Sequence, residues 1–279
     1  MDLVVQAPHI EPVEIGALAD VARARGIRVI EGGGQETFRL IEVTASAALT
    51  DACGRGAFDH ALVSPDLQRE RVGLVAMDMD STLITIECID EIADMLGIKP
   101  QVAAITASAM RGEIDFAQSL TRRVALLAGL SVDALQRVYD ERLRLSPGAE
   151  RMLQGFKAVG AKTLLVSGGF TFFTERLRER LALDETLSNL LEVENGNLTG
   201  RIHGSIVDAR AKAQRFAELR DRYARAGGIA VAIGDGANDV PMLERADVSI
   251  AYHAKPVVRE RTTYAINHCG LDAVLNLFG

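Results

Sequence analysis

Three short apolar segments, GLVAMD, AKTLLVSGG and GIAVAIGDG, constrain the fold of this chain more than any other feature of its sequence. They occupy residues 73–78, 161–169 and 228–236, and each ends in aspartate, serine or glycine. Continuous apolar strands separated by helical segments are typical of a parallel sheet that helices cover on both faces. The pattern therefore predicts an α/β protein built on a doubly wound parallel sheet.

The sequence on either side of the first apolar segment predicts two further units. Residues 1–70 show short elements in the order βαββαβ, which is the ferredoxin-like α+β pattern. Residues from about 84 to 147 have helical spacing and no strand signal, so we expect an inserted helical cap. Asn195-Gly196 between two apolar runs predicts a hairpin with a tight turn. We expect one domain of residues 1–70 and a second of residues 71–279 that contains the cap.

Charge and hydropathy exclude several classes of function. The net charge of the 279 residues is −7 at pH 7, whereas nucleic-acid-binding proteins normally carry a basic excess. No apolar run approaches a membrane span, and residues 1–12 lack the features of a signal peptide. Cys53, Cys88 and Cys269 are too few and too scattered for a disulfide framework. We expect a cytoplasmic protein without a nucleic-acid or membrane partner.

Polar groups follow all three apolar segments, at the sheet edge where ligands bind in doubly wound folds. They are, in chain order, Asp78 and Asp80, Ser167 with Gly168 and Gly169, and Asp235, Asn238 and Asp239. Crowded carboxylates repel one another, and a hard cation with oxygen ligands is the usual compensation. We therefore expect Asp78, Asp235 and a backbone carbonyl next to Asp78 to hold Mg²⁺ beside a phosphate group.

The two aspartates of the first segment can divide the work of phosphoryl transfer. Asp78 can attack phosphorus and form an aspartyl-phosphate, which water later hydrolyses. Asp80 can protonate the leaving alcohol and then take a proton from the attacking water. Ser167 and the free N–H groups of the glycine turn would donate to phosphate oxygens, with a lysine as counter-charge. A helix-capping role would explain one aspartate but not the acidic groups after the third segment.

Four motifs in this order resemble those of the haloacid dehalogenase superfamily. They are DMDST (78–82), SGG (167–169), a lysine within DARAKAQRF, and GDGAND (234–239). Longer stretches, including DMDSTLITIECIDEIADMLG and AMRGEIDFAQSLTRRVALLAGL, resemble its phosphoserine phosphatases and extend the similarity over most of residues 73–279. The resemblance implies a Rossmann-like core with a helical cap. It also implies Mg²⁺-dependent hydrolysis of O-phospho-L-serine through an aspartyl-phosphate, the last step of serine biosynthesis.

The resemblance also implies roles for individual residues. Asp78 is the implied nucleophile and Asp80 the implied acid and base. The implied Mg²⁺ ligands are Asp78, the carbonyl of Asp80 and Asp235, with Asp239 in support. The implied substrate contacts are Ser167, Gly168, Lys212 and Asn238 at the phosphate, Glu87 at the ammonium group, Arg123 at the carboxylate, and Met110 and Phe116 in the cap. On spacing alone, Lys212, Glu87 and Arg123 lie among charged residues that are usually solvated.

Three alternatives stay open at this point. Residues 1–70 resemble the ACT-like domains of related phosphatases but carry no sharp ligand motif, so they are a structural module, a homodimerisation module or a serine sensor. The chemistry could act on another small phosphorylated amino acid, or transfer the phosphoryl group to another alcohol. A non-catalytic amino-acid sensor is the alternative of a different class. The complete set Asp78, Asp80, Ser167, Lys212 and Asp235 argues against it.

Overall fold

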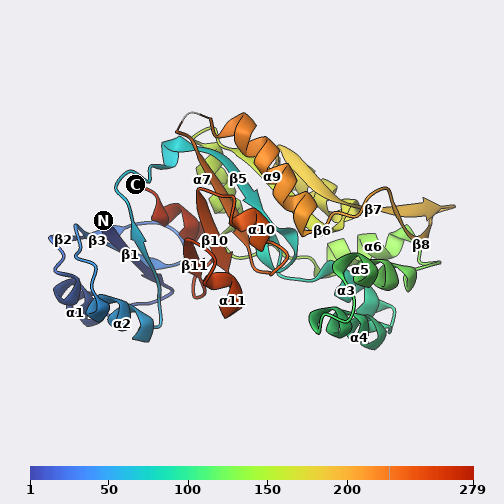
Figure 1. Ribbon diagram of the computed structural model, residues 1–279, viewed down its shortest axis with the longest axis horizontal. Helices are drawn as coiled ribbons and strands as arrows, with labels where there is room; N and C mark the ends of the chain where they lie inside the picture. Colours follow the sequence, from blue (N-terminus) through green and yellow to red (C-terminus); the bar gives the residue numbers. More distant parts are fainter. Residues whose placement is uncertain (226) are drawn as a thin grey trace.

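The computed structural model describes residues 1–225 and 227–279. These residues form two β-sheets (Figure 1). The N-terminal sheet is antiparallel with the order β2-β3-β1-β4. Its strands are β1 (Asp2–Ala7), β2 (Gly26–Ile30), β3 (Glu36–Ile41) and β4 (Asp59–Val63), with helices α1 (Pro12–Ala22) and α2 (Ala47–Arg55). The predicted βαββαβ order is confirmed. Alternate residues of β1, such as Leu3 and Val5, bury themselves against the two helices.

The second sheet has the strand order β11-β10-β9-β5-β6-β7-β8 and is parallel except for β8. Its strands are β5 (Val72–Met77), β6 (Lys162–Phe170), β7 (Glu185–Glu194), β8 (Asn197–His203), β9 (Ile229–Gly234), β10 (Val248–Tyr252) and β11 (Tyr264–Ile266). The three apolar segments form β5, β6 and β9, which are neighbours at its centre. The chain adds strands on one side of β5 and then on the other, so the doubly wound prediction is confirmed.

Helices cover both faces of the parallel sheet, which explains why its central strands are apolar throughout. One face packs against α7 (Ala149–Lys157), α8 (Thr171–Leu181) and the 3₁₀ helix η4 (Leu271–Leu277). The other face packs against α9 (Ala209–Tyr223) and α10 (Val240–Leu243). A short 3₁₀ helix η1 (Arg69–Arg71) precedes β5, and α11 (Pro256–Arg259) lies between β10 and β11.

The predicted helical cap lies between β5 and β6. It contains α3 (Cys88–Met95), α4 (Lys99–Met110), α5 (Phe116–Ala125), α6 (Val132–Arg137) and a π-helical turn η3 (Val138–Arg142). Asp115 begins α5 with a capping box to Gln118. In Figure 1 the cap (green) and the N-terminal sheet (blue) lie at opposite ends of the long axis.

The hairpin formed by β7 and β8 contacts the cap. Its turn at Asn195 and Gly196 has φ values of 49° and 79°, as the predicted tight turn requires. Leu198 next to this turn accepts a backbone hydrogen bond from Gly129 and donates one to Leu130. The hairpin is therefore bonded through its backbone to the loop between α5 and α6.

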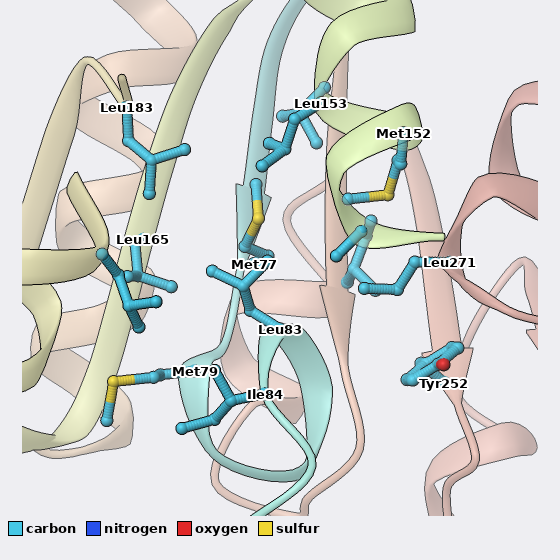
Figure 2. Packing of buried hydrophobic residues seen from close by; sticks show 14 of the residues in the cluster. Met77, Met79, Leu83, Ile84, Met152, Leu153, Leu165, Leu183, Tyr252 and Leu271 are labelled. Atoms are coloured by element: carbon cyan, nitrogen blue, oxygen red, sulfur yellow. The ribbon is translucent and has the colours of Figure 1, made fainter. Parts of the chain in front are cut away.

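The turn after β5, η2 (Met79–Leu83), is not a regular helix, because Asp80 and Ser81 have non-helical backbone angles; apolar side chains anchor it. Met79, Leu83 and Ile84 are fully buried in the main core, beside Met77 of β5 (Figure 2). Because Met79 points into this core, the residues on either side of it can face away from it. The anchored turn therefore presents Asp78 and Asp80 at the sheet edge.

Buried polar contacts join the N-terminal sheet to the C-terminal helix η4. Arg39 donates from Nη2 to the carbonyls of Asn276 and Phe278, at 3.0 and 2.9 Å. The side chain of Asn276 donates to Gln6 and to Thr37. Residues 271–278 therefore cover the face of the N-terminal sheet opposite its helices. Among the described residues, no helix is long and apolar enough to cross a membrane.

Candidate active site

A cavity of about 390 Å³ lies where the carboxyl ends of β5, β6 and β9 meet the cap. Ten of the twelve predicted site residues line it: Asp78, Asp80, Glu87, Met110, Phe116, Arg123, Ser167, Gly168, Asp235 and Asn238. The remaining two, Lys212 and Asp239, are buried directly behind it. Residues separated by up to 160 positions therefore gather around one space, as the strand-end argument predicted.

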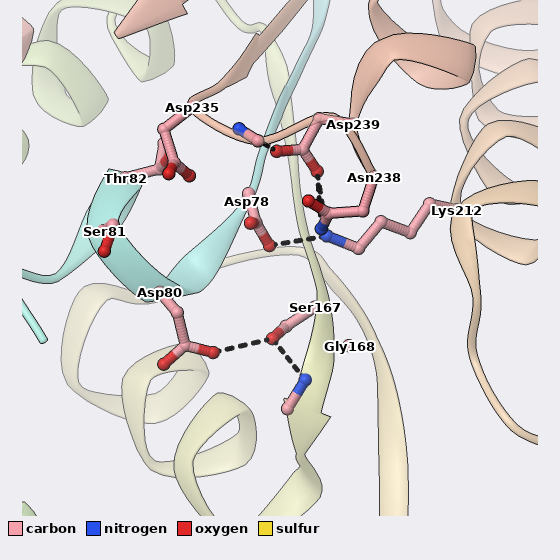
Figure 3. A network of polar contacts seen from close by, with 12 residues as sticks. Asp78, Asp80, Ser81, Thr82, Ser167, Gly168, Lys212, Asp235, Asn238 and Asp239 are labelled. Carbon is pink, nitrogen blue, oxygen red and sulfur yellow. Dashed lines mark hydrogen bonds and ion pairs between the residues drawn. The ribbon is translucent and has the colours of Figure 1, made fainter. Parts of the chain in front are cut away.

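Lys212 neutralises part of the acidic charge at the back of the cavity. Its Nζ donates to Oδ1 of Asp78 at 2.7 Å and to Oδ1 of Asp239 at 2.9 Å (Figure 3). Helix α9 places this lysine inside, because Lys212 shares the buried helix face with Phe216 and Leu219. Burial lowers the pKa of Lys212, but the charges of Asp239 and Asp78 outweigh that effect and raise it. The side chain is therefore a permanent ammonium group.

Asp78, Asp235 and Asp239 form an acidic cluster whose carboxylate oxygens lie within 4.8 Å of one another. Asp235 accepts a hydrogen bond from Thr82 Oγ1 at 3.0 Å, and within residues 1–225 and 227–279 it has no ion-pair partner. Burial and the charge of Asp239 raise the pKa of Asp235 to about 6. Burial, followed by the charge of Asp239, also raises the pKa of Asp78 well above its usual range. The single ammonium group of Lys212 does not balance the negative charge of the three carboxylates. The carboxylate oxygens of the cluster are suitable ligands for a hard divalent cation.

The second aspartate of the turn, Asp80, faces the cap and strand β6. Its Oδ1 accepts a hydrogen bond from the backbone N–H of Cys88 at 2.9 Å, and its Oδ2 accepts one from Ser167 Oγ at 3.4 Å (Figure 3). Burial raises the pKa of Asp80, although the Cys88 N–H opposes this shift. Asp80 is therefore biased toward the protonated form that a general acid needs.

The glycines after Ser167, near the end of β6, allow close contacts on both sides of the strand. A Cβ atom at Gly168 would lie 2.9 Å from Cζ of Phe116, a cap residue. A Cβ atom at Gly169 would lie 3.0 Å from Oδ2 of Asp80. The Ser-Gly-Gly sequence therefore serves close packing between core and cap as well as hydrogen bonding.

The cap contributes two groups of opposite charge to the cavity. Burial, followed by the charge of Asp80, raises the pKa of Glu87 to about 7, although the Ser81 hydroxyl at 2.8 Å opposes the shift. Arg123 donates from Nε to the Ser119 carbonyl at 3.4 Å, and among the described residues it forms no ion pair. An acid and an unpaired guanidinium group thus face the same space. Met110 at its rim is 70% exposed.

Two positioning contacts were not predicted from the sequence. Ser81 adopts a left-handed conformation with φ of 54° and donates to Glu87, which links the turn after β5 to the cap. Thr82 is fully buried and donates to Asp235 across 153 positions of sequence. Both lie inside the DMDST motif, which was the only available signal for them.

Comparisons with known proteins agree with this geometry. Residues 75–244 match the family model of the haloacid dehalogenase-like hydrolases. A phosphoserine phosphatase from Polaromonas is 53% identical over 221 residues, which cover 77% of this chain and 94% of that protein. A crystal structure described as a probable phosphoserine phosphatase from Vibrio cholerae has a TM-score of 0.85 and 33% identity. It is matched over 99% of this chain and 85% of its own.

A third similar protein is a solved structure described as a phospho-aspartyl intermediate analogue of phosphoserine phosphatase. Its TM-score is 0.67 at 34% identity, and the match covers 75% of this chain and 99% of the other.

Proposed function

The chain belongs to the haloacid dehalogenase-like hydrolases and, within them, to the phosphoserine phosphatases, and from this premise we propose the reaction that it catalyses. The reaction is the Mg²⁺-dependent hydrolysis of O-phospho-L-serine to L-serine and phosphate, the last step of serine biosynthesis. One observation carries the proposal. A buried carboxylate next to an ammonium group, a second and separately held carboxyl group, and a cap acid with a cap guanidinium share one cavity.

The nucleophile is Asp78. Its Oδ1 is held by Lys212, so the carboxylate has a fixed direction at the end of β5. Asp78, the carbonyl of Asp80 and Asp235 would hold Mg²⁺, with Asp239 in support. This fits the acidic cluster, whose charge a single lysine does not balance. When bound, the ion would offset negative charge on the phosphate oxygens and keep the Asp78 carboxylate ionised.

Two proton transfers by Asp80 accompany the two displacement steps. Asp78 forms an oxygen–phosphorus bond while the bond from phosphorus to the serine oxygen breaks, and Asp80 gives its proton to that oxygen. Asp80 then takes a proton from water, whose oxygen attacks phosphorus and releases the carboxylate of Asp78. The raised pKa of Asp80 supports a protonated carboxyl group at the start of the reaction. Hydrogen bonds from Ser167 and the Cys88 N–H hold this carboxyl group in place.

Phosphate oxygens would bind to Ser167, the N–H of Gly168, Lys212 and Asn238. The amino-acid end of the substrate would bind to the cap. Glu87 would receive the ammonium group and Arg123 the carboxylate, because a zwitterion needs one anion and one forked cation. Met110 and Phe116 would enclose the substrate from the cap side.

We also propose that residues 1–70 form a separate ACT-like domain with a regulatory or dimerising function. Their own apolar core, between the antiparallel sheet and helices α1 and α2, supports an independent folding unit.

The experiment is a steady-state assay of phosphate release from a panel of esters, with Mg²⁺ and with excess EDTA. The panel holds O-phospho-L-serine, O-phospho-L-threonine, O-phosphohomoserine, p-nitrophenyl phosphate and a sugar phosphate. We expect the highest kcat/KM for O-phospho-L-serine and loss of activity in EDTA. A higher kcat/KM for another amino-acid ester would select the alternative substrate. Binding of serine without phosphate release from any ester would overturn the phosphatase proposal.

A further inference from the structure

Ser167, Gly168 and Gly169 belong to strand β6 but lie outside its regular ladder with β7. The parallel register runs from Leu164 to Val166 and resumes only at Phe170, which pairs with Asn189 of β7. Residues 167–169 therefore lie at an irregularity of the strand pairing. Glycine backbones rotate more freely than others, so other contacts must fix the peptide groups at such an irregularity.

The side chain of Asn189 supplies that contact. It is 1% exposed, its Nδ2 donates to the carbonyl of Gly168 at 2.8 Å, and its Oδ1 accepts from the backbone N–H of Val207 at 2.8 Å. Both halves of the amide are used, and both partners are backbone groups outside regular pairing. Each polar atom of this buried amide therefore has a protein partner, which distinguishes it from an incidental surface contact.

The carbonyl of Gly168 and the N–H of Gly169 belong to one planar peptide group. Asn189 holds the carbonyl end, and Ser167 Oγ holds the N–H end by accepting from Gly169 at 2.8 Å. Ser167 in turn directs its hydroxyl proton toward Oδ2 of Asp80 at 3.4 Å. Rotation of this peptide would remove the donor that orients the Ser167 hydroxyl. Asn189 thus determines the direction of the serine through the peptide between them.

The Oδ1 atom of Asn189 accepts from a residue next to the start of α9, the helix that carries Lys212. Val207 directly precedes Asp208, which begins helix α9 by accepting from the N–H of Ala211 at 2.8 Å. Lys212 lies on the first turn of the same helix and contacts Asp78. One buried amide therefore connects the Ser-Gly-Gly segment of β6 with the start of the helix that carries the lysine.

We propose that Asn189 is a positioning residue for the phosphate site, acting through the Gly168–Gly169 peptide and the start of α9. The inference rests on the proposed phosphatase reaction. It predicts a specific kinetic signature, because the side-chain bonds of Asn189 go to Gly168 and Val207, which lead to the groups proposed to bind the phosphate end of the substrate.

The test compares Asn189→Asp, Asn189→Ala and the wild-type protein. Asn189→Asp is isosteric and, in its ionised form, keeps an oxygen for the Val207 N–H but has no donor for Gly168. Ser188→Ala is the matched control, since Ser188 is the neighbouring residue of β7 and bonds the hydroxyl of Thr174 instead of the Ser-Gly-Gly segment. The inhibition constant of inorganic phosphate and kcat/KM for O-phospho-L-serine and p-nitrophenyl phosphate are measured. Thermal unfolding establishes that each variant is folded.

For Asn189→Asp we expect phosphate inhibition weaker by about tenfold, the scale of one unsatisfied buried hydrogen-bonding group. The kcat/KM for both esters should fall by a common factor, so that their ratio is unchanged, while Ser188→Ala behaves like wild type. A folded Asn189→Asp with wild-type phosphate inhibition would overturn the inference and leave the phosphatase proposal intact. Absence of activity in wild type would instead reject the proposed function. Where Asn189→Ala does not fold, Asn189→Asp decides the result.

Discussion

The Nζ atom of Lys212 lies 2.7 Å from Oδ1 of Asp78, and the lysine side chain is only 1% exposed. A buried lysine is unfavourable unless its charge is paired, and here two carboxylates pair it. The same three groups leave a net negative charge at the back of the cavity. The lysine therefore has both a structural role and an electrostatic one.

Replacing Lys212 by methionine keeps most of the side-chain volume and removes the charge. Asp78 and Asp239 would then be buried without an ammonium partner, and the free energy of unfolding should fall by about 3–5 kcal/mol. Urea unfolding at neutral pH in EDTA measures this loss, and Mg²⁺ should restore part of it. Arg210→Met, an exposed site on the same helix, is the control. Equal effects of the two substitutions would contradict the buried-pair interpretation.

Substitutions of the two aspartates in the turn after β5, Asp78 and Asp80, should give different results when the phosphoenzyme is trapped with p-nitrophenyl phosphate. Asp78→Asn should form no phosphoenzyme, because it removes the nucleophile. Asp80→Asn should accumulate phosphoenzyme, since this leaving group needs little protonation but hydrolysis still needs a base. Its kcat should fall by about 100-fold or more. Intact-protein mass spectrometry after an acid quench measures both. Turnover by Asp78→Asn that is free of deamidated protein would exclude Asp78 as nucleophile.

Arg123 and Arg122 are adjacent on α5 but differ in position. Arg123 lines the cavity, and Arg122 is exposed. Arg123→Ala should raise KM for O-phospho-L-serine by roughly tenfold or more, because a charge-assisted contact to the carboxylate is lost. KM for p-nitrophenyl phosphate should change little, and Arg122→Ala should change neither value. A similar rise for both esters would remove Arg123 from the amino-acid end of the site.

The raised pKa of Glu87 predicts that the preference for O-phospho-L-serine depends on pH. Its pKa is raised to about 7, so the group is largely neutral below that pH and ionised above it. The ratio of kcat/KM for O-phospho-L-serine to that for p-nitrophenyl phosphate should rise as pH increases through about 7, because only the ionised acid attracts the ammonium group. Taking the ratio removes the titration of the phosphate that both esters share. Glu87→Gln should give a pH-independent ratio, and a persisting rise would assign the titration to another group.

Mg²⁺ should stabilise the protein more at neutral pH than in acid. The pKa of Asp235 is raised to about 6, so the native state holds this proton more tightly than the unfolded chain. Its contribution to stability is complete below its ordinary pKa and is lost as pH rises through about 6. Metal binding requires the ionised carboxylate and should offset that loss. The increase in Tm with Mg²⁺ should be larger at about pH 7.5 than at about pH 5. In Asp235→Asn this increase should be much reduced.

Local sequence patterns predicted the elements whose periodicity is strong. The strands β5, β6 and β9, the βαββαβ order, the cap helices and the hairpin at Asn195 all follow from apolar runs and turn residues. The strands β10 and β11 were not predicted. They are short, and their burial depends on β9 and on β4, which contacts β11 from the N-terminal sheet.

For the site, too, the sequence could predict residues with a local pattern but not those whose contacts depend on distant parts of the chain. Lys212 was predicted only through the family resemblance, because its neighbours Arg210 and Arg215 suggest a solvated helix. Its phase with Phe216 and Leu219 was a usable signal, since positions i, i+4 and i+7 share one helix face. Thr82 and Asn189 gave no such signal. Their partners lie far away in sequence or depend on an irregularity in strand pairing.

The contact between Arg39 and the carbonyls of Asn276 and Phe278 has a consequence for the order of events during synthesis. Strands β1 and β3 leave the ribosome more than two hundred residues before η4 does, since Arg39 and Asn276 are 237 positions apart. Until η4 has been synthesised, Arg39, Gln6 and Thr37 lack their native partners from the C-terminal segment. The sheet face that η4 covers in the native protein is then exposed to solvent. This face of the first domain to be translated therefore reaches its native packing only after the rest of the chain has been synthesised.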